Sequence, residues 1–354
     1  MLTEYIDRIR AAHAAGVPLV IQGGGSKAFY GNARVGDTLD TRRLADIVDY
    51  QPKELVLTAQ AGTPLDEIEA LLSEQGQMLA YEPPHFGGGA TLGGSIAAGL
   101  SGPRRPYAGA ARDFVLGVRM IDGTGQTLRF GGQVIKNVAG YDVSRLMVGA
   151  LGTLGLITEI SLKVLPRPAA ETTLQFELDE AAAIDKMNRW AGQALPLSAT
   201  SWHADLLTVR LSGATSAVHA AQAKLGGEVA HDPGAFWQRL RDQTTPFFDI
   251  HTHHPTLKKW RLAVKSSTPP LDLATAQWIE WGGAVRWLMT DLPASTLREI
   301  ARNAGGHATL FHGEPPADGV FTPLSPPLLS VHRQLKQRFD PGNILNRGRL
   351  SATF

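Results

Sequence analysis

Glycine is concentrated in residues 87–109, which read GGGATLGGSIAAGLSGPRRPYAG and include the basic pair Arg104 and Arg105. Glycine lets the main chain adopt positive φ and approach a ligand closely, and its N–H groups can bind phosphate oxygens together with a nearby arginine. The segment is therefore interpreted either as a backbone cradle for phosphate groups or as an ordinary surface loop. Two further glycine clusters, at 23–31 and 149–155, lie in the same half of the chain.

Composition limits the kinds of protein that this chain can be. Its 354 residues are enough for two or three compact units, and a net charge of +1 argues against a nucleic-acid partner. No run approaches the roughly 18 apolar residues of a membrane span, and the N-terminus does not resemble a signal peptide, so we expect a cytoplasmic protein. Cysteine is absent. A redox reaction would therefore need an organic cofactor or another subunit, because cysteine-ligated iron–sulfur clusters and thiol catalysis are excluded.

Local patterns predict an α+β chain in three parts. Residues 114–121 and 126–130 are expected to form a hairpin around the turn 122–125, and other strands alternate with helical stretches. We place a first domain over 1–168, a second α+β domain over 169–325 and a C-terminal tail over 326–354. The tail contains the turn-rich sequence DPGNILNRGRL, and we expect it to dock on the first domain.

The glycine clusters do not match the two commonest nucleotide motifs. None of them spells the P-loop G-x-x-x-x-G-K-[ST], and those that follow strands do not give a G-x-G-x-x-G that opens a helix. Three separate clusters suit a long dinucleotide, whose pyrophosphate, adenosine and flavin ends need several backbone segments to converge. The pattern therefore favours FAD over a mononucleotide or a nicotinamide cofactor.

Four motifs carry a resemblance to a known family. They are QGGGSK at 22–27, TLGGS at 91–95 with Ser-Gly at 101–102 after it, KNVAGYD at 136–142 and GTLGLIT at 152–158. Together they resemble the vanillyl-alcohol-oxidase/PCMH-type flavoproteins, and within that family most of all the FAD-binding subunits of bacterial glycolate oxidases. Further landmarks at 247–248, 260–261, 281–283 and 340–342 extend the resemblance over nearly the whole chain.

The resemblance implies a PCMH-type FAD-binding domain of two α+β lobes and a smaller α+β cap domain. It implies that the cofactor is held by Gln22, Gly23, Gly24, Gly25, Ser26, Lys27, Thr91, Gly93, Gly94, Ser95, Ser101, Gly102, Arg105, Tyr107, Gly152, Gly155 and Ile157. Some members attach FAD covalently through histidine or cysteine, whereas the first loop here has Lys27 and Phe29. We therefore expect non-covalent FAD, with His85 beside the second loop as the alternative attachment point.

The resemblance also implies a reaction, namely oxidation of a short 2-hydroxy acid, glycolate or D-lactate, to the 2-oxo acid by hydride transfer to FAD. The expected partners are a second FAD-containing subunit and an iron–sulfur subunit, which could bring the chain to the periphery of the inner membrane. Two alternatives stay open. The chain is a flavin-binding or scaffolding subunit without turnover of its own, or it is a stand-alone oxidase that uses oxygen directly.

Candidate catalytic residues lie in the second domain. Period-2 alternation in the expected strand 260–267 places Arg261 and Lys265 on one face, where they would bind a substrate carboxylate or form a solvated strand face. His307 is a candidate base for the hydroxyl proton or a structural histidine. Arg286 is a candidate contact to substrate or flavin.

Two further groups of polar residues have open interpretations. Asp249, His251, His253 and His254 have spacing that suits a metal site, although their setting favours a solvated loop, and no metal is expected. Lys136 and Asn137 lie among glycines, so they are expected either near the flavin or a partner, or in a surface turn.

Overall fold

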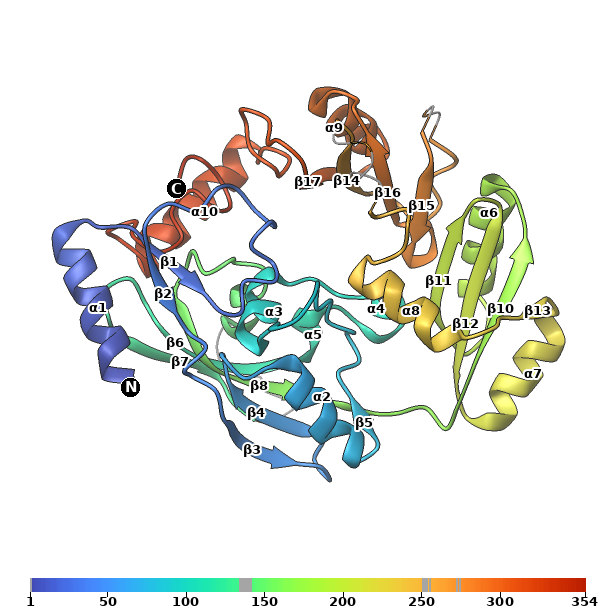
Figure 1. Cartoon of the computed structure of the whole chain (residues 1–354), viewed down its shortest axis with the longest axis horizontal. Helices are drawn as coiled ribbons and strands as arrows, with labels where there is room; N and C mark the ends of the chain where they lie inside the picture. The colour runs from blue at the N-terminus through green and yellow to red at the C-terminus, as the bar shows by residue number, and fades with distance from the viewer. Residues whose placement is uncertain (1, 134–141, 250–253, 255, 272, 274) are drawn as a thin grey trace. The chain divides into compact units, whose positions relative to one another are not determined.

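The chain divides into two compact units, which are described separately (Figure 1). This computed structural model describes residues 2–133, 142–249, 254, 256–271, 273 and 275–354. The first unit comprises Met1–Leu100, Ala110–Pro166 and Pro323–Phe354, and the second comprises Ser101–Gly109 and Arg167–Thr322. None of the helices in the described part of the chain combines the length and the apolar character that crossing a bilayer requires.

The first unit is built on a five-stranded antiparallel sheet with the order β3-β4-β8-β6-β7. Its strands are β3 (Ile47–Gln51), β4 (Val56–Gln60), β6 (Val115–Ile121), β7 (Thr127–Gly131) and β8 (Leu156–Lys163). The predicted hairpin is confirmed, because Asp122 Oδ1 accepts hydrogen bonds from the N–H groups of Thr124 and Gln126 and turns β6 into β7.

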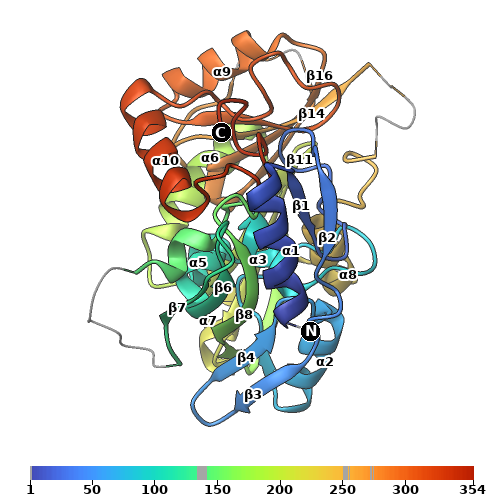
Figure 2. The ribbon, with the colours of Figure 1, turned by 90° about the vertical axis from the view of Figure 1, so that its left-hand side faces the viewer.

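Smaller elements complete the first unit around this sheet. They are α1 (Leu2–Ala15), β1 (Leu19–Gln22), β2 (Asp37–Asp40), α2 (Leu65–Glu74), β5 (Gln77–Met78), α5 (Ala111–Phe114), η1 (Ser144–Met147), β9 (Leu165–Pro166) and α10 (Pro326–Phe339). Strands β1 and β2 pair in parallel beside α1 (Figure 2). Tyr5 and Ile9 of α1 pack there against Leu19 and Leu39, so the apolar stripe of the helix covers this pair.

The glycine-rich segment 87–109 is more regular than the loop that its composition predicts. It contains α3 (Leu92–Ala98), which belongs to the first unit, and α4 (Arg105–Ala108), which belongs to the second. Thr91 caps α3 by accepting a hydrogen bond from Gly94 N–H, and Gly99 ends it with φ of +64°. These capping residues explain why a short helix forms among glycines.

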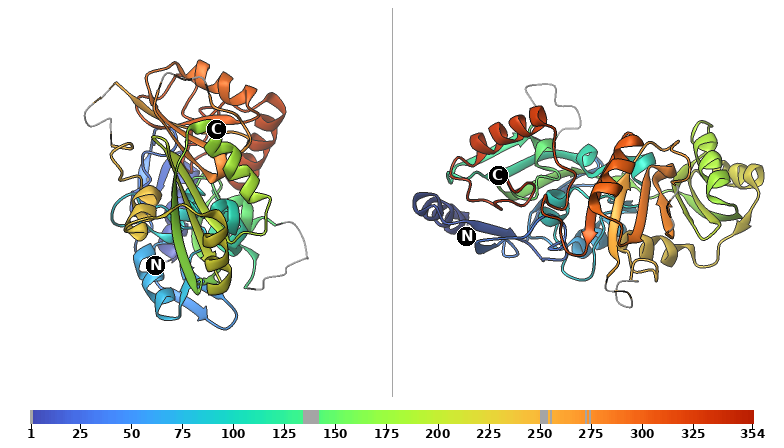
Figure 3. Two further views of the ribbon diagram at one scale, coloured as in Figure 1. Left: turned by 90° about the vertical axis from the view of Figure 1, so that its right-hand side faces the viewer. Right: turned by 90° about the horizontal axis from the view of Figure 1, so that it is seen from above.

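The second unit contains an eight-stranded antiparallel sheet with the order β13-β10-β12-β11-β15-β16-β14-β17. Its strands are β10 (Ala170–Glu177), β11 (Leu197–His203), β12 (Leu206–Gly213), β13 (Glu228–Val229), β14 (Lys258–Ala263), β15 (Gln277–Glu280), β16 (Val285–Thr290) and β17 (His307–His312). Its other helices are α6 (Glu180–Ala191), α7 (Thr215–Leu225), α8 (Pro233–Asp242), η3 (Trp281–Gly283) and α9 (Ala294–Asn303). Helices α6 and α7 lie along the β10-β12-β11 part of the sheet (Figure 3).

The strand predicted over 260–267 is shorter than its sequence pattern indicates. Strand β14 ends at Ala263, and Lys265 lies beyond it in a turn in which Thr268 N–H donates to the Lys265 carbonyl. The serines, threonine and prolines that follow favour a turn over an extended strand. The alternation that would place Lys265 beside Arg261 therefore does not hold.

Candidate functional site

A cleft in the first unit is lined by all three glycine clusters and by the C-terminal tail. The empty volume of the cleft, including the part that is open to solvent, is about 790 Å³. The predicted cofactor residues that line it are Gln22, Gly23, Gly24, Gly25, Ser26, Lys27, Thr91, Gly93, Gly94, Gly152, Gly155 and Ile157. Residues far apart in the sequence thus meet where β1 ends, α3 begins and β8 begins.

The glycine loops at 23–31 and 87–109, which are the first and second along the chain, pack closely together. This close packing explains why their positions are occupied by glycine. A Cβ atom on Gly24 would overlap the carbonyl group of Gly89, and one on Gly23 would overlap the side chain of Thr91. A Cβ atom on Gly93 would lie 2.8 Å from the Ala61 carbonyl oxygen. The glycines therefore bring two stretches of main chain together at the edge of the cleft.

The C-terminal tail connects the first and third clusters. Asn346 accepts a hydrogen bond from Ile21 N–H at 2.7 Å and donates one to the Leu151 carbonyl at 2.6 Å. A Cβ atom on Gly152 would lie 2.6 Å from the Asn346 amide nitrogen, so this amide also needs a glycine beside it. The tail is thereby part of the cleft wall.

A buried ion pair holds the tail in place. The Lys336 ammonium of α10 donates to an Asp340 carboxylate oxygen at 2.7 Å and to the carbonyls of Thr153 and Leu345, both at 2.8 Å. Asp340 also accepts from the N–H groups of Ile344 and Leu345. Burial lowers the pKa of Lys336, and the neighbouring Asp340 opposes that shift. Three carbonyl or carboxylate acceptors satisfy the buried ammonium.

The cleft carries positive charge. The Arg34 guanidinium donates to the Gln22 side chain at 2.6 Å, and buried Arg349 donates to the carbonyls of Ala28, Tyr30 and Asn32. Burial, and secondly the nearby Arg34, lower the pKa of Arg349 to about 10. Among the described residues that line the cleft there is no aspartate or glutamate. A glycine cradle with two arginines fits a bound phosphate group.

Five predicted cofactor residues have other positions. The Ser95 hydroxyl is buried at 3.2 Å from the Tyr81 hydroxyl. Ser101, Gly102, Arg105 and Tyr107 belong to the second unit. There Trp281 donates to the Gly102 carbonyl at 3.1 Å, and the Arg105 guanidinium lies 4.4 Å from the centre of the Trp281 ring. Burial raises the pKa of Tyr107, whose hydroxyl bonds to Thr200.

Sequence reasoning missed several residues that line the cleft. They are Ile21, Ala28, Arg34, Thr41, Ala61, Ala97, Ala98, Leu151, Asn346 and Arg349. The two from the tail are more than 300 positions from the first glycine loop, so local sequence patterns do not connect them. The turn-rich composition of the tail predicts docking, but not which of its side chains reach the cleft.

The second unit brings two of the candidate catalytic residues onto neighbouring strands. Arg261 of β14 pairs with Thr309 of β17, and His307 of β17 pairs with Ala263. The Arg261 guanidinium lies 4.9 Å from the centre of the Phe311 ring. Burial, and secondly the charge of Arg261, lower the pKa of His307. The register therefore places a guanidinium and an imidazole on neighbouring strands.

Arg286 lies in the interior of the second unit. Its side chain has no exposed surface, and its guanidinium is 3.4 Å from Glu180 and donates to the Thr268 carbonyl at 2.8 Å. Burial lowers the pKa of Arg286 to about 10, and Glu180 opposes that shift. These contacts place the Arg286 side chain inside the protein, where none of its surface is accessible to a ligand.

Two candidate groups lie wholly or partly outside the described residues. Of the possible metal cluster, Asp249 and His254 lie within the described residues, whereas His251 and His253 lie outside them. Lys136 and Asn137 are also outside the described residues.

Comparisons with known proteins identify the cofactor and the family. A family model described as "FAD binding domain" matches residues 2–131. The glycolate oxidase subunit GlcE of Escherichia coli (strain K12) is 50% identical over 347 residues, which cover 98% of this chain and 96% of that protein. The glycolate oxidase subunit GlcD of Bacillus subtilis (strain 168) is 34% identical over 186 residues, which cover 51% of this chain and 39% of that protein.

A solved structure supports the fold. The 4-ethylphenol oxidase of Gulosibacter chungangensis aligns with a TM-score of 0.69 at 12% identity, covering 99% of this chain and 87% of that one. The predicted α+β fold with an FAD-binding domain is thereby confirmed. The chain is a flavoprotein with FAD as its cofactor, and it belongs to the family of the glycolate oxidase subunit GlcE.

Proposed function

We propose that this chain is the FAD-binding subunit of a glycolate oxidase complex, which oxidises a short 2-hydroxy acid to the 2-oxo acid. The observation that carries the proposal is the 50% identity to the E. coli subunit over almost the full length of both chains. Glycolate is the expected substrate, and D-lactate is the closest alternative in size and chemistry.

FAD occupies the glycine-lined cleft of the first unit in this proposal. The main chain at 23–26 and the residues Gly93 and Gly94 lie beside the diphosphate, whose negative charge is balanced by Arg34 and Arg349. Both arginines line the cleft, and their charge is not offset by an aspartate or glutamate among its described lining residues. Charge-assisted hydrogen bonds to phosphate oxygens are the interaction that such guanidinium groups make best.

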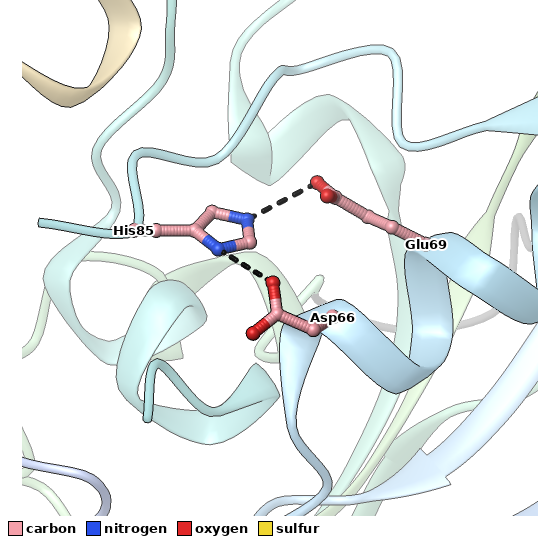
Figure 4. A group of neighbouring side chains, drawn as sticks. All are labelled: Asp66, Glu69 and His85. Carbon is pink, nitrogen blue, oxygen red and sulfur yellow. Dashed lines mark hydrogen bonds and ion pairs between the residues drawn. The ribbon is translucent and has the colours of Figure 1, made fainter. Parts of the chain in front are cut away.

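The flavin is held without a covalent bond in this proposal. His85 is the histidine nearest the second glycine loop in the sequence, and its two ring nitrogens lie 3.1 Å from Asp66 and 3.3 Å from Glu69. Both ring nitrogens therefore have carboxylate neighbours (Figure 4), and His85 is not among the described residues that line the cleft. Cysteine, the other common attachment residue, is absent from the sequence.

FAD, when bound, supplies the acceptor for the hydride that leaves the carbon bearing the hydroxyl group. The chain's own residues bind the substrate and take up the proton. Arg261 binds the carboxylate, and a ring nitrogen of His307 accepts the hydroxyl proton. The lowered pKa of His307 supports this role, because a base must be neutral before it can accept a proton.

The partners in this proposal are a second flavoprotein subunit and an iron–sulfur subunit that carries electrons onward. The match to a glycolate oxidase subunit with another name, GlcD of B. subtilis, supports a partner subunit that is related in sequence to this chain. The lack of cysteine means that an iron–sulfur cluster with cysteine ligands must reside in another chain. Association with the inner membrane would come through those partners.

Purification of the native complex tests the proposal. The complex should contain flavin and iron, and anaerobic glycolate should bleach the flavin absorbance of this subunit. Arg261→Ala should slow bleaching while leaving the flavin content unchanged. A complex in which this chain carries no flavin would refute the cofactor assignment.

The isolated chain separates the two alternatives. A chain that binds FAD but is not bleached by glycolate would be a flavin-binding or scaffolding subunit. Stoichiometric hydrogen peroxide from the isolated chain and glycolate would instead identify a stand-alone oxidase.

A further inference from the structure

Two cations share one face of the sheet in the second unit. Lys259 and Arg261 lie two positions apart on β14, which runs between β16 and β17 (Figure 1). Trp260 and Leu262 belong to the hydrophobic core, so the alternation of a strand turns both cations to the opposite face. Two residues of a strand span about 6.6 Å. The pair of cations that the sequence indicated at Arg261 and Lys265 is therefore formed by Arg261 and Lys259.

Three buried aromatic rings lie beneath these two cations. The ring centres of Phe248 and Trp287 are 5.5 Å apart, and those of Trp287 and Phe311 are 4.7 Å apart. The Lys259 ammonium lies 5.4 Å from the centre of the Phe248 ring. The Arg261 guanidinium lies 4.9 Å from the centre of the Phe311 ring. The cations thus occupy opposite ends of a series of three rings, an arrangement that suits two anionic groups better than one.

Both cations retain hydrogen-bond donors for a ligand. The Lys259 ammonium has three N–H donors, and among the described residues only Gln243 accepts a hydrogen bond from it, at 3.3 Å. The Arg261 guanidinium contacts aromatic rings, and no residue in the described part of the chain accepts a hydrogen bond from it. Burial lowers the pKa of Lys259 to about 8, and Asp249 opposes that shift. An anionic ligand would offset the cost of burying this charge.

The order of the groups on this face sets the direction in which a ligand lies. His307 of β17 pairs with Ala263, which is two positions beyond Arg261 on the side away from Lys259. In the proposed function, on which this inference rests, His307 takes the hydroxyl proton and Arg261 binds the adjacent carboxylate. Lys259 then lies on the far side of Arg261 from the base. It is in place for the distal end of a longer acid.

We propose that Lys259 forms a second anion subsite, which binds the distal carboxylate of a four- or five-carbon 2-hydroxy diacid. Arg261 holds the carboxylate next to the carbon that bears the hydroxyl group. The reaction at that carbon is the same as for glycolate, because the hydroxyl proton goes to His307, the hydride goes to FAD and the C–O bond becomes a carbonyl. The buried rings strengthen both ionic contacts, since charges interact more strongly beside an apolar interior than in water.

Turnover of acids of matched length by the native complex tests the proposal. Malate and 2-hydroxyglutarate carry two carboxylates, whereas 2-hydroxybutanoate and 2-hydroxypentanoate have the same chain lengths with one. At least one diacid should exceed its one-carboxylate counterpart in kcat/KM by about 10- to 100-fold, the effect of a hydrogen bond between charged groups. Glutarate should likewise inhibit glycolate oxidation more strongly than pentanoate, which measures binding without turnover.

Substitutions on β14 assign this preference to one side chain. Lys259→Met should bring the ratio of the two kcat/KM values close to 1, whereas Lys259→Arg keeps the charge and should retain the ratio. Lys258→Met is the matched control and should also retain it, because Lys258 is the preceding residue of the same strand and alternates to the other face. Flavin content and melting temperature show that each variant is folded.

The pH dependence separates an anion subsite from a structural role. The charged and titratable groups around Lys259 are Arg261 on its own strand, His307 and His312 on β17, and Asp249 beyond α8. Lys259 loses its proton as the pH rises through about 8, so the diacid preference should fall above that pH and persist in Lys259→Arg. Taking the ratio cancels the titration of His307, which acts on both acids.

Three results would overturn the inference. They are equal kcat/KM values for each diacid and its counterpart, a preference that Lys259→Met retains, and a preference in the unchanged chain that is the same at pH 7 and pH 9.5. Bleaching of the flavin by glycolate in the same preparations shows that the proposed function stands in those cases. Loss of that bleaching in the unchanged complex would refute the proposed function instead.

Discussion

Alanine in place of Gly24 should force the first two glycine loops apart. A Cβ atom at this position would lie 2.6 Å from the Gly89 carbonyl carbon and closer still to its oxygen. Ordinary van der Waals contact begins at 3.4 Å and the overlap with the oxygen is the larger one, so the loops must separate by about 2 Å. Both loops line the cleft, and the displacement therefore falls on the FAD site itself.

The cost of Gly24→Ala can be estimated from the cost of overpacking. Extra methylene groups in tightly packed regions cost about 1–3 kcal/mol, which corresponds to about a 5- to 150-fold weaker Kd for FAD if the bound state carries the cost. Gly88→Ala is the matched control. Its Cβ atom would meet nothing within 4 Å, and its φ is not in the left-handed region.

Quenching of flavin fluorescence during titration of the FAD-free chain gives the two Kd values, and thermal melting reports stability. Gly24→Ala should show the weaker binding, and Gly88→Ala should stay within about twofold of the unchanged chain. Equal FAD affinity in all three proteins, or equal loss in both variants, would refute the packing of these loops around the cofactor.

Further predictions concern the charged residues. Arg349→Met should weaken FAD binding by about 10- to 100-fold and make it less sensitive to salt, and unchanged affinity would remove Arg349 from the diphosphate site. Lys336→Met should destabilise the first unit by about 3–5 kcal/mol in urea unfolding, because it leaves Asp340 buried and uncompensated, and a loss below 1 kcal/mol would contradict this. Burial lowers the pKa of Lys259 to about 8, so the unfolded chain binds more protons between about pH 8 and 10 and stability should rise with pH in that range. Lys259→Met should abolish that rise in melting temperature. Arg261→Ala should raise the KM for glycolate by about 10-fold or more at unchanged flavin content, and an unchanged KM would exclude Arg261 as the carboxylate ligand.

Local chemistry explains the parts of the fold that sequence patterns predicted well. The turn at 122–125 contains Asp122, whose side chain closes the hairpin by itself, so a short stretch of sequence is sufficient to predict it. The glycine clusters likewise predicted places where the main chain is closely approached. They did not indicate which other segment of the same chain makes that approach.

Long-range contacts explain what could not be predicted. Asn346 and Arg349 reach the cleft because the buried pair Lys336–Asp340 fixes the position of the tail. The sequence around these residues does not indicate which side chains of the tail will face the cleft. Similarly, 101–109 continues the glycine-rich segment in sequence but joins the second unit in space, where Trp281 contacts it. Strand β14 ends at Ala263 because the chain then turns, with Thr268 N–H bonded to the Lys265 carbonyl. The alternation of apolar and charged residues in the sequence continues past Ala263 and therefore predicted a longer strand.

A crystal structure of the chain with bound FAD is the most direct test of the cofactor site. We expect diphosphate density between residues 23–26 and the start of α3, within hydrogen-bond distance of Arg349 or Arg34, and no covalent link to His85. Diphosphate density outside the cleft of the first unit, or a bond between the flavin and His85, would contradict the site described above.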